Sequence, residues 1–391
     1  MNFPERFSDL PAATWPRLRA LLDVPTKAAE TINMTIGEPR HAFPAFVGDI
    51  LAANLAGFNK YPDNDGTVAH LDAIAGFLHR RYGLTVPHEQ ILTLNGTREG
   101  LYNAAMALCP EAKNGKPVIL TPNPFYQVYA VAALSVGAAP YYVPATAATN
   151  HLPDYHAVPA EILNRTAIAY ACSPANPQGA VADEAYWRDL ITLAEKHDFQ
   201  ILADECYSEI YRDTPPTGAL EVATKMGAHP ERVVIFHSLS KRSNLPGLRS
   251  GFCAGGPESL RRMRLLRAFA GAPLPEPLQA VAAAVWNDEA HVVENRALYH
   301  RKYDIADDIL GHIDGYQSPQ AGFFLWLPVS DGEEAAVHLW QETGVRTLPG
   351  AYLSKVQDGE NPGTGYIRVA MVAPTQDVQR GLTLIRDCLY G

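Results

Sequence analysis

Basic residues and long apolar stretches are scarce in this chain of 391 residues. Its 32 lysines and arginines are outnumbered by 42 aspartates and glutamates, which gives a formal net charge of −10. That balance argues against nucleic acid as a partner, because binding to a phosphate backbone requires a basic surface. No apolar run approaches the roughly 20 residues that a transmembrane helix needs, and the N-terminal residues lack the pattern of a secretion signal. We therefore expect a cytoplasmic protein with no membrane partner.

Paired cysteines and dinucleotide-binding glycine motifs are also missing. The five cysteines lie far apart, with no CxxC pair, at Cys109, Cys172, Cys206, Cys253 and Cys388. Such spacing predicts neither a disulfide framework nor a zinc site, and we expect no metal. A GxGxxG motif follows none of the predicted strands, which counts against a dinucleotide-binding fold.

One lysine, Lys241, lies in a segment that has the groups to bind an aldehyde and a phosphate. The apolar run 233–236 predicts a buried strand, and Ser238 and Arg249 flank the lysine that follows it. A lysine amine can condense with an aldehyde as a Schiff base, and an arginine with a serine hydroxyl can bind a phosphate. An aldehyde and a phosphate on one small molecule describe pyridoxal phosphate. A solvated turn is the alternative that this segment alone leaves open.

Other polar residues follow or interrupt predicted strands. Strand and helix patterns alternate between residues 90 and 255, which predicts a doubly wound, mostly parallel sheet. Gly96 lies between a strand and a helix, where free amides form an anion site. Asp204 ends the strand 200–204, at the edge where such sheets bind ligands, and its carboxylate can keep a pyridine nitrogen protonated. Arg368 lies among apolar residues, and a buried arginine requires an anionic partner.

Three motifs resemble those of class I/II, fold type I, pyridoxal-phosphate-dependent aminotransferases. They are Ser238-x-x-Lys241, Gly247-x-Arg249-x-Gly251 and Asn176-Pro177-x-Gly179. The resemblance extends from about Ile36 to Arg368. It implies an α/β fold in which a large domain has a mostly parallel, doubly wound sheet and both chain ends form a smaller α+β domain. It also implies a homodimer with a shared active site.

The domain boundaries follow from this resemblance and from changes in composition. Residues 1–45 are expected to form an N-terminal arm and part of the small domain, residues 46–272 the large cofactor-binding domain, and residues 273–391 the C-terminal small domain. A proline-rich break at 271–277 precedes a segment, 278–310, that is predicted to be one long helix.

The resemblance implies a role for each residue of the site. Lys241 is expected to bind pyridoxal 5′-phosphate and to move the substrate's proton, with Asp204 and Tyr207 as the other catalytic residues. The cofactor-binding set comprises Gly96, Thr97, Arg98, Tyr126, Asn176, Asp204, Tyr207, Ser238, Lys241, Arg249 and Tyr61. In this set Tyr126 lies against the pyridine ring, and Tyr61 reaches the cofactor phosphate of the neighbouring subunit. The substrate-binding set comprises Gly37, Asn176 and Arg368.

The substrates are expected to be an amino acid donor and a 2-oxo acid. The motifs around 36–39, 123–126, 204–211 and 240–244 are similar to those of N-succinyldiaminopimelate aminotransferases of bacterial lysine biosynthesis. Transfer from N-succinyl-LL-2,6-diaminopimelate to 2-oxoglutarate is the predicted reaction. An aminotransferase for aromatic or aliphatic amino acids, a C–S β-lyase and a cofactor-binding regulator are the alternatives. Arg98, Arg242 and Arg40 are the candidates to bind a distal substrate carboxylate.

Overall fold

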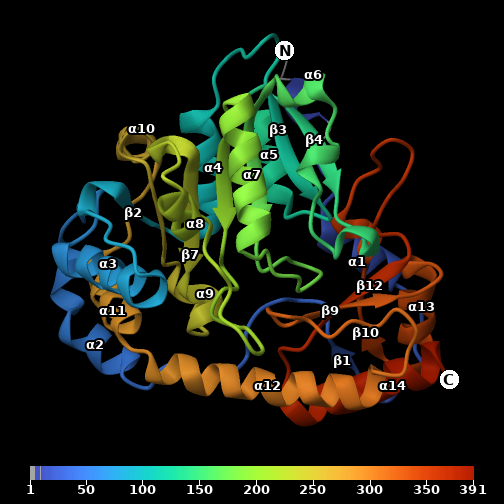
Figure 1. The fold of residues 1–391 in the computed structure, drawn as a ribbon. Helices are drawn as coiled ribbons and strands as arrows, with labels where there is room; N and C mark the ends of the chain where they lie inside the picture. The colour runs from blue at the N-terminus through green and yellow to red at the C-terminus, as the bar shows by residue number, and fades with distance from the viewer. Residues whose placement is uncertain (1–4, 9) are drawn as a thin grey trace.

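A computed structural model of the chain describes residues 5–8 and 10–391, and its fold is drawn in Figure 1. The extreme N-terminal residues 1–4, part of the segment judged to lack a secretion signal, lie outside the described residues. Among the described residues, no helix is long and apolar enough to cross a membrane.

A seven-stranded sheet forms the centre of the large domain. Its strands are β2 (Ile91–Leu94), β3 (Val118–Asn123), β4 (Ala139–Pro144), β5 (Thr166–Cys172), β6 (Gln200–Asp204), β7 (Val233–Ser238) and β8 (Gly251–Gly255). They are ordered β2-β8-β7-β6-β5-β3-β4, and β8 alone runs antiparallel to the other six strands. The prediction of a mostly parallel, doubly wound sheet is confirmed.

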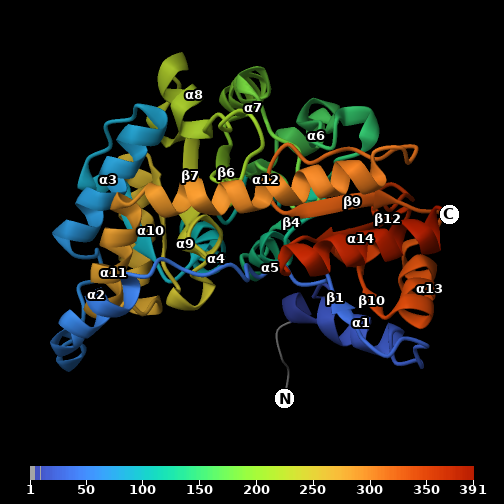
Figure 2. The same ribbon diagram turned by 90° about the horizontal axis from the view of Figure 1, so that it is seen from below.

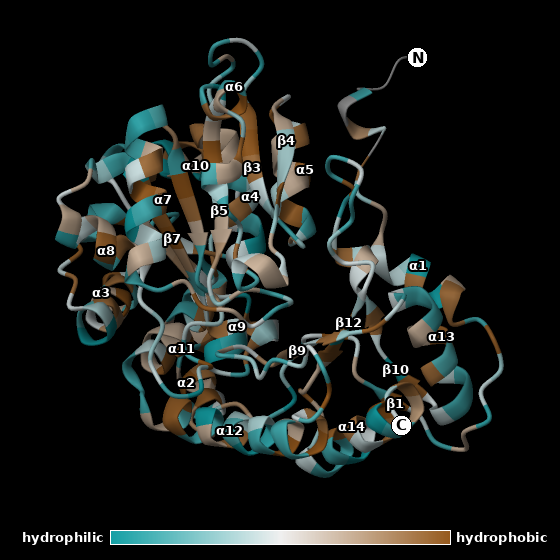
Figure 3. Ribbon diagram, turned by 45° about the vertical axis from the view of Figure 1, so that its right-hand side comes forward, coloured by the Kyte–Doolittle hydropathy of each residue, from teal (hydrophilic) through white to brown (hydrophobic). Residues whose placement is uncertain are grey.

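Helices cover both faces of this sheet because its strands are apolar on both sides. Along β7, Val233 and Ile235 point into one buried cluster, whereas Val234 and Phe236 point into another. The first face is covered by α3 (Val68–Tyr82), α7 (Glu184–His197), α8 (Ala219–Met226) and α11 (Glu276–Asn287), and the second by α4 (Thr97–Leu108), α5 (Gln127–Ser135) and α10 (Pro257–Ala270). Figure 3 shows β3 and β7 largely in brown between helices of mixed colour. Such two-sided burial is typical of parallel sheets.

The small domain contains segments from both ends of the chain. The strands β9 (Phe324–Pro328), β11 (Leu348–Pro349) and β12 (Tyr366–Ala370) form an antiparallel sheet, and β1 (Ile32–Asn33) pairs in parallel with β10 (Val345–Arg346). The helices α13 (Gly332–Thr343) and α14 (Thr375–Leu389) pack beside these strands, and α1 (Thr14–Leu21) belongs to the N-terminal arm. Ile32 and Met34 share one buried cluster with residues of α14.

The segment predicted as one helix over 278–310 is two helices. The first is α11, and α12 (Ala290–Leu310) begins after a break at Asp288 and Glu289. Asp288 is the C-cap of α11, and its carboxylate accepts a hydrogen bond from the amide of His291 (3.1 Å) in the first turn of α12. The α11 side chains Val281 and Trp286 belong to the core of the large domain. We therefore propose that the second domain boundary lies near residue 288 rather than 272.

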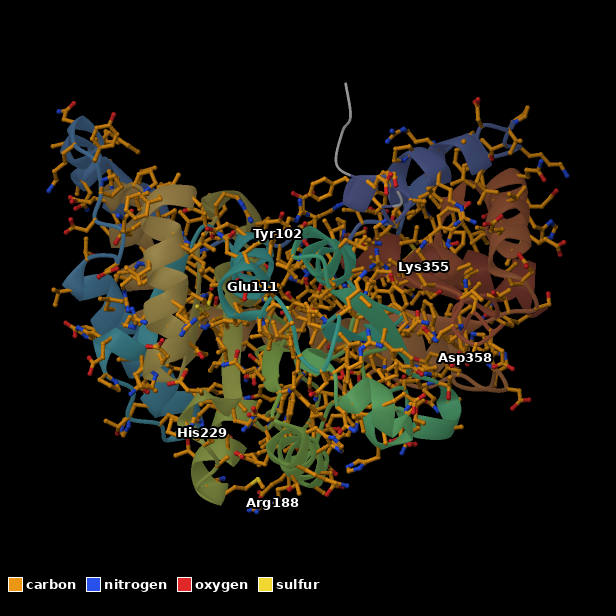
Figure 4. All side chains as sticks on the ribbon, turned by 90° about the horizontal axis from the view of Figure 1, so that it is seen from above. Tyr102, Glu111, Arg188, His229, Lys355 and Asp358 are labelled. Carbon is orange, nitrogen blue, oxygen red and sulfur yellow. The ribbon has the colours of Figure 1, made fainter. Side chains whose placement is uncertain are left out.

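The helix α12 then extends beneath both domains (Figures 1 and 2). Its side chains Tyr299, Tyr303 and Ala306 are buried in the small-domain core. The remaining α-helices are α2 (Val47–Ala53), α6 (Ala160–Leu163) and α9 (Leu239–Arg242). Polar side chains project from the periphery of the molecule, for example Arg188 and His229 in Figure 4.

Candidate active site

A cavity of about 420 Å³ opens at the carboxyl ends of β3, β5 and β6, where chain connections leave the sheet in opposite directions. Ligands of doubly wound folds bind at such a switch point. The cavity is lined by eleven residues that the sequence predicts for the site, namely Gly37, Thr97, Arg98, Tyr126, Asn176, Asp204, Tyr207, Ser238, Lys241, Arg249 and Arg368. Residues from distant parts of the chain and from both domains therefore meet in one place.

Two predicted site residues do not line this cavity. Gly96 lies directly behind its wall, at the N-cap of α4. Tyr61 is fully exposed, at 100% of its accessible surface. Its predicted contact is with a neighbouring subunit, so this role stays a prediction.

Lys241 lies on the short helix α9, at the end of β7. Ser238 caps this helix, since its Oγ accepts a hydrogen bond from the amide of Ser240 (3.1 Å). The lysine Nζ donates to the carbonyl oxygen of Gly37, which holds it in the cavity. The pKa of Lys241 is lowered to about 8, chiefly by burial and also by the charges of Arg368 and Arg249, while Cys206 and Glu38 oppose the shift. Far more of this amine is therefore uncharged near neutral pH than in an ordinary lysine, as a nucleophile or base requires.

An anion cradle lies at the N-terminus of α4. Gly96 has a φ of 82°, and a Cβ at this position would collide with the guanidinium of Arg249. Arg249 donates from Nη1 to the carbonyl of Pro246 (2.7 Å) and from Nη2 to that of Asn95 (3.3 Å). A fixed guanidinium, the hydroxyl of Ser238 and the positive end of a twelve-residue helix together suit a phosphate.

Asp204 is a buried carboxylate with few partners. It is 7% exposed, and its Oδ2 accepts from the hydroxyl of Tyr129 at 2.7 Å. The amide of Cys206 approaches Oδ1 at 3.3 Å. Burial raises the pKa of Asp204. A cationic N–H group in the cavity would offset the cost of keeping this carboxylate charged.

Tyr129 is a site residue that the sequence reasoning missed. It lines the cavity, it is 1% exposed, and its ring stacks on Tyr170 with centroids 4.5 Å apart. It lies three residues after Tyr126 at the start of α5, so the two rings share one helix face. That spacing was the available signal. Only the fold shows that this face meets Asp204.

Arg368 is a buried guanidinium that bonds to neutral groups. It is 5% exposed and donates from Nη1 to Asn176 Oδ1 (3.1 Å) and from Nη2 to the carbonyl of Thr35 (2.8 Å). Its Nε is buried without a protein partner. The guanidinium carbon lies 4.2 Å from the centre of the Phe324 ring. Burial lowers the pKa of Arg368 to about 10. A carboxylate in the cavity would supply the missing negative charge.

The aromatic wall of the site contains Tyr207 and Tyr126. Tyr207 packs edge-on against Phe323 and Phe324, with ring centroids 5.4 and 5.9 Å away. Tyr126 accepts a 2.5 Å hydrogen bond from Nε of Arg98. Both tyrosines have a pKa raised by burial, so both are neutral hydrogen-bonding groups at neutral pH.

The three arginines considered for a distal carboxylate lie in different surroundings. Arg98 lines the cavity, but neither Arg40 nor Arg242 is among its lining residues. Arg242 is buried behind it, where Nη1 donates to the carbonyl of Val285 (2.9 Å) and Nη2 pairs with Glu289 (3.0 Å). The structure therefore removes Arg242 from the candidates, because its charge already has a partner away from the cavity.

These features fit a pyridoxal phosphate group. The cradle beside α4 matches a phosphate, Asp204 matches a protonated pyridine nitrogen, and Lys241 is a partly uncharged amine in the same cavity. The unpaired Nε of Arg368 leaves a cation for the carboxylate of a substrate. The residues of the cavity therefore suit both the cofactor and an amino acid substrate.

Known proteins resemble this chain over nearly its full length. A curated LL-diaminopimelate aminotransferase of Dehalococcoides mccartyi is 29% identical over 399 aligned positions that cover 99% of both sequences. Among solved structures, an aminotransferase from Neisseria meningitidis is 36% identical with a TM-score of 0.93, and covers 98% of both chains. The aminotransferase AspB of Helicobacter pylori is 32% identical with a TM-score of 0.89, over 99% of both.

The family comparison agrees with the geometry of the cavity. The model of the family described as aminotransferase class I and II matches residues 29–385. This range includes every residue that lines the cavity except two of the N-terminal arm, Thr14 and Trp15. The chain therefore belongs to the class I and II aminotransferases, and its cofactor is pyridoxal 5′-phosphate.

Proposed function

We propose that this aminotransferase moves the amino group of N-succinyl-LL-2,6-diaminopimelate to 2-oxoglutarate, a step in lysine biosynthesis. The observation that carries this proposal is the guanidinium of Arg98 in the cavity wall, in addition to those of Arg249 and Arg368. Two arginines suffice for the cofactor phosphate and the α-carboxylate. The third suits a second carboxylate, which both 2-oxoglutarate and the succinylated donor carry.

The side chains of the cavity divide the reaction between them. Arg368 and the amide of Gly37 hold the α-carboxylate, and Asn176 fixes the guanidinium of Arg368 from the other side. The cofactor, when bound, supplies an electron sink for the bond that breaks at the substrate's α-carbon. Asp204 would keep the ring nitrogen of the cofactor protonated. With the cofactor bound, Lys241 would remove the α-proton and deliver it to the cofactor carbon that is joined to the amino nitrogen, for which its lowered pKa is suited.

Unsubstituted LL-diaminopimelate is a second candidate donor. The curated relative from Dehalococcoides mccartyi has an LL-diaminopimelate aminotransferase as its printed name. In addition, Glu38 lines the cavity. Its carboxylate would suit an ammonium group at the far end of the donor. Succinylation removes that ammonium charge, so the two donors make opposite demands on Glu38.

A panel of donors tests the proposed function. The holoenzyme is incubated with 2-oxoglutarate and one amino donor at a time, and the glutamate formed is measured. The donors are N-succinyl-LL-diaminopimelate, LL-diaminopimelate, an aromatic amino acid, a branched aliphatic amino acid and alanine. The succinylated donor is expected to have the highest kcat/KM. A preference for an uncharged donor would contradict the proposal, and release of pyruvate and ammonia from cysteine-type substrates would indicate a β-lyase instead.

Replacement of Arg98 by alanine should selectively weaken donors with a distal carboxylate. A hydrogen bond to a charged group contributes about 1.5–3 kcal/mol, so kcat/KM for the succinylated donor should fall roughly ten- to a hundredfold. Alanine has no distal group and should be affected much less. Tyr126→Phe is the matched control, because it removes the hydroxyl that Arg98 contacts and keeps the guanidinium. Equal losses for both donors in Arg98→Ala would refute this role.

We further propose a homodimer with active sites shared between subunits. Tyr61 is fully exposed, and Leu55, Phe58 and Phe269 are also exposed, at 53%, 53% and 94%. Lys60, which precedes Tyr61, forms an ion pair with Glu276 at the start of α11. This ion pair links the segment of Leu55, Phe58 and Tyr61 to the segment that follows α10. A group of exposed apolar side chains of this kind is typical of an interface.

Mixing two inactive variants tests the shared site. A Lys241→Ala subunit paired with a Tyr61→Ala subunit gives one site with both lesions and one with neither. After subunit exchange at equal concentrations, about half of the dimers are hybrids, so about a quarter of wild-type activity should return. Each variant incubated alone is the control. A mixture that is no more active than its parents would contradict a shared site.

A further inference from the structure

One fully buried lysine, Lys302, is not among the residues that line the active-site cavity. Lys302 of α12 is 0% exposed. Its Nζ lies 2.8 Å from Nε2 of His41 and 3.0 Å from the carbonyl oxygen of Met371, beyond the end of β12. It is also 5.1 Å from the ring centre of Tyr299. A fully buried amine is unusual and costly, so its partners indicate what it does.

The hydrogen bonds of His41 define its tautomer. Oδ1 of Asn295 accepts from Nδ2 of Asn244 (3.1 Å), and Nδ2 of Asn295 points to the carbonyl of Arg242 (3.5 Å). The contact of 2.9 Å between His41 Nδ1 and the same Oδ1 therefore has the imidazole as donor. Neutral His41 then has its lone pair on Nε2, which is the atom that faces Lys302. A second proton on this pair would put two donors face to face.

This polar chain leads directly to the active site. Asn244 also donates to the carbonyl of Ala42 (3.1 Å), and it lies three residues after Lys241. His41 and Ala42 end the loop that begins at Gly37, whose carbonyl accepts from the amine of Lys241. The chain thus joins α12, the loop 37–42 and the segment after the catalytic lysine.

The charged groups around the pair have the same sign. Burial lowers the pKa of Lys302 to about 7. The pKa of His41 is also lowered, mainly by burial and then by the charges of Lys302 and Arg301. The hydrogen bond to Asn295 opposes this shift. The other facing groups are the neutral ring of Tyr299 and the backbone carbonyl of Met371. A second proton would therefore add a like charge to a dry site.

We propose that Lys302 and His41 are positioning residues that share at most one proton and thereby hold the loop 37–42 against Lys241, and that a second proton opens this loop. The proposal concerns the loop of the aminotransferase and does not depend on which donor is the substrate. The sign follows from linkage. Both groups have lowered pKa values in the closed form. The open form therefore binds more protons, and the closed loop becomes more stable as pH rises from below 6.5 towards 10.

Hydrogen–deuterium exchange of the cofactor-free protein tests this inference without an activity readout. Exchange of the peptide that spans 35–44 is compared at pH 6.0 and 8.0, after correction for the intrinsic rate at each pH. Each linked proton changes an opening equilibrium by up to about tenfold per pH unit, so protection in the wild type should be roughly ten- to a hundredfold higher at pH 8.0. The KM of the holoenzyme for the donor should rise over the same interval as pH falls.

Two substitutions separate proton sharing from a purely structural role. Lys302→Met removes the amine and keeps the apolar stem, and His41→Gln supplies an acceptor that cannot be protonated. The double variant should show almost no pH dependence of protection, and each single variant should show less than the wild type. Lys113→Met is the control, because Lys113 donates to the carbonyls of Thr166 and His197, outside this network.

Several outcomes would overturn the inference. A double variant that retains the wild-type ratio of protection between pH 6.0 and 8.0 would exclude Lys302 and His41 as its source. A uniform loss of protection at both pH values, with the ratio unchanged in both single variants, would indicate packing only. Failure of the proposed substrate leaves these exchange results unaffected, so the two proposals can fail independently.

Discussion

Lys241→Ala should abolish turnover and leave no covalent link between protein and cofactor. Lys241 is the lysine among the described residues that line the cavity, and its pKa of about 8 leaves far more of the amine uncharged near neutral pH than in an ordinary lysine. Loss of a positioned acid–base group alone costs about 10²- to 10⁴-fold in rate, and loss of the attachment adds to that. The measurement is kcat together with the absorbance and borohydride-reducible attachment of the cofactor.

Lys241→Arg is the matched variant for this prediction. It keeps a positive charge at the same place but cannot release its proton, so it should be as inactive as the alanine variant. If the alanine variant still fixed the cofactor after reduction with borohydride, another amine would be the attachment point, and the assignment of Lys241 would be wrong.

Asp204→Asn should retain the cofactor and lose most of the catalytic rate. The amide can still accept the hydrogen bond of Tyr129, but it carries no charge to keep the ring nitrogen protonated. Removal of one preorganised electrostatic group typically lowers kcat by about 10²- to 10³-fold, and a loss of this size is expected. The measurements are kcat for the best donor and the affinity for the cofactor, followed by its absorbance.

Tyr129→Phe separates the charge of Asp204 from its orientation. This variant removes the 2.7 Å hydrogen bond and leaves the carboxylate in place, so its loss of rate should be much smaller than that of Asp204→Asn. An Asp204→Asn protein with near-normal kcat would exclude the electrostatic role. Equal losses in both variants would instead point to orientation as the main contribution of the carboxylate.

The sequence was sufficient to predict most of the large domain, for a physical reason. The strands that lead to Asp204 and Lys241 have apolar runs that stop at polar residues, so the pattern itself marks the carboxyl edge of a parallel sheet. The fold comparison and the family match confirm the fold type and the cofactor that the resemblance implied. The individual roles at the site remain predictions that the variants above test.

Features that depend on packing between distant segments were not predictable in this way. The hydroxyl of Tyr129 meets Asp204 because α5 packs on one particular face of the sheet, and no local pattern encodes that contact. Arg242 was a candidate for the substrate because it follows Lys241, yet α9 turns its side chain towards α11. The break between α11 and α12 lies within an otherwise helical pattern, and there the carboxylate of Asp288 bonds to the amide of His291.

The pairing of β1 with β10 has a consequence for synthesis on the ribosome. Ile32 emerges early, but its partner Val345 is translated more than three hundred residues later. The large domain can fold while Ile32 and Met34 still expose apolar side chains that have no core to join. We expect a nascent chain stalled before residue 345 to carry an unpaired β1, whose exposed apolar side chains are open to chaperones at this stage. The cavity gains Arg368, and with it the substrate's anchor, only when translation is almost complete.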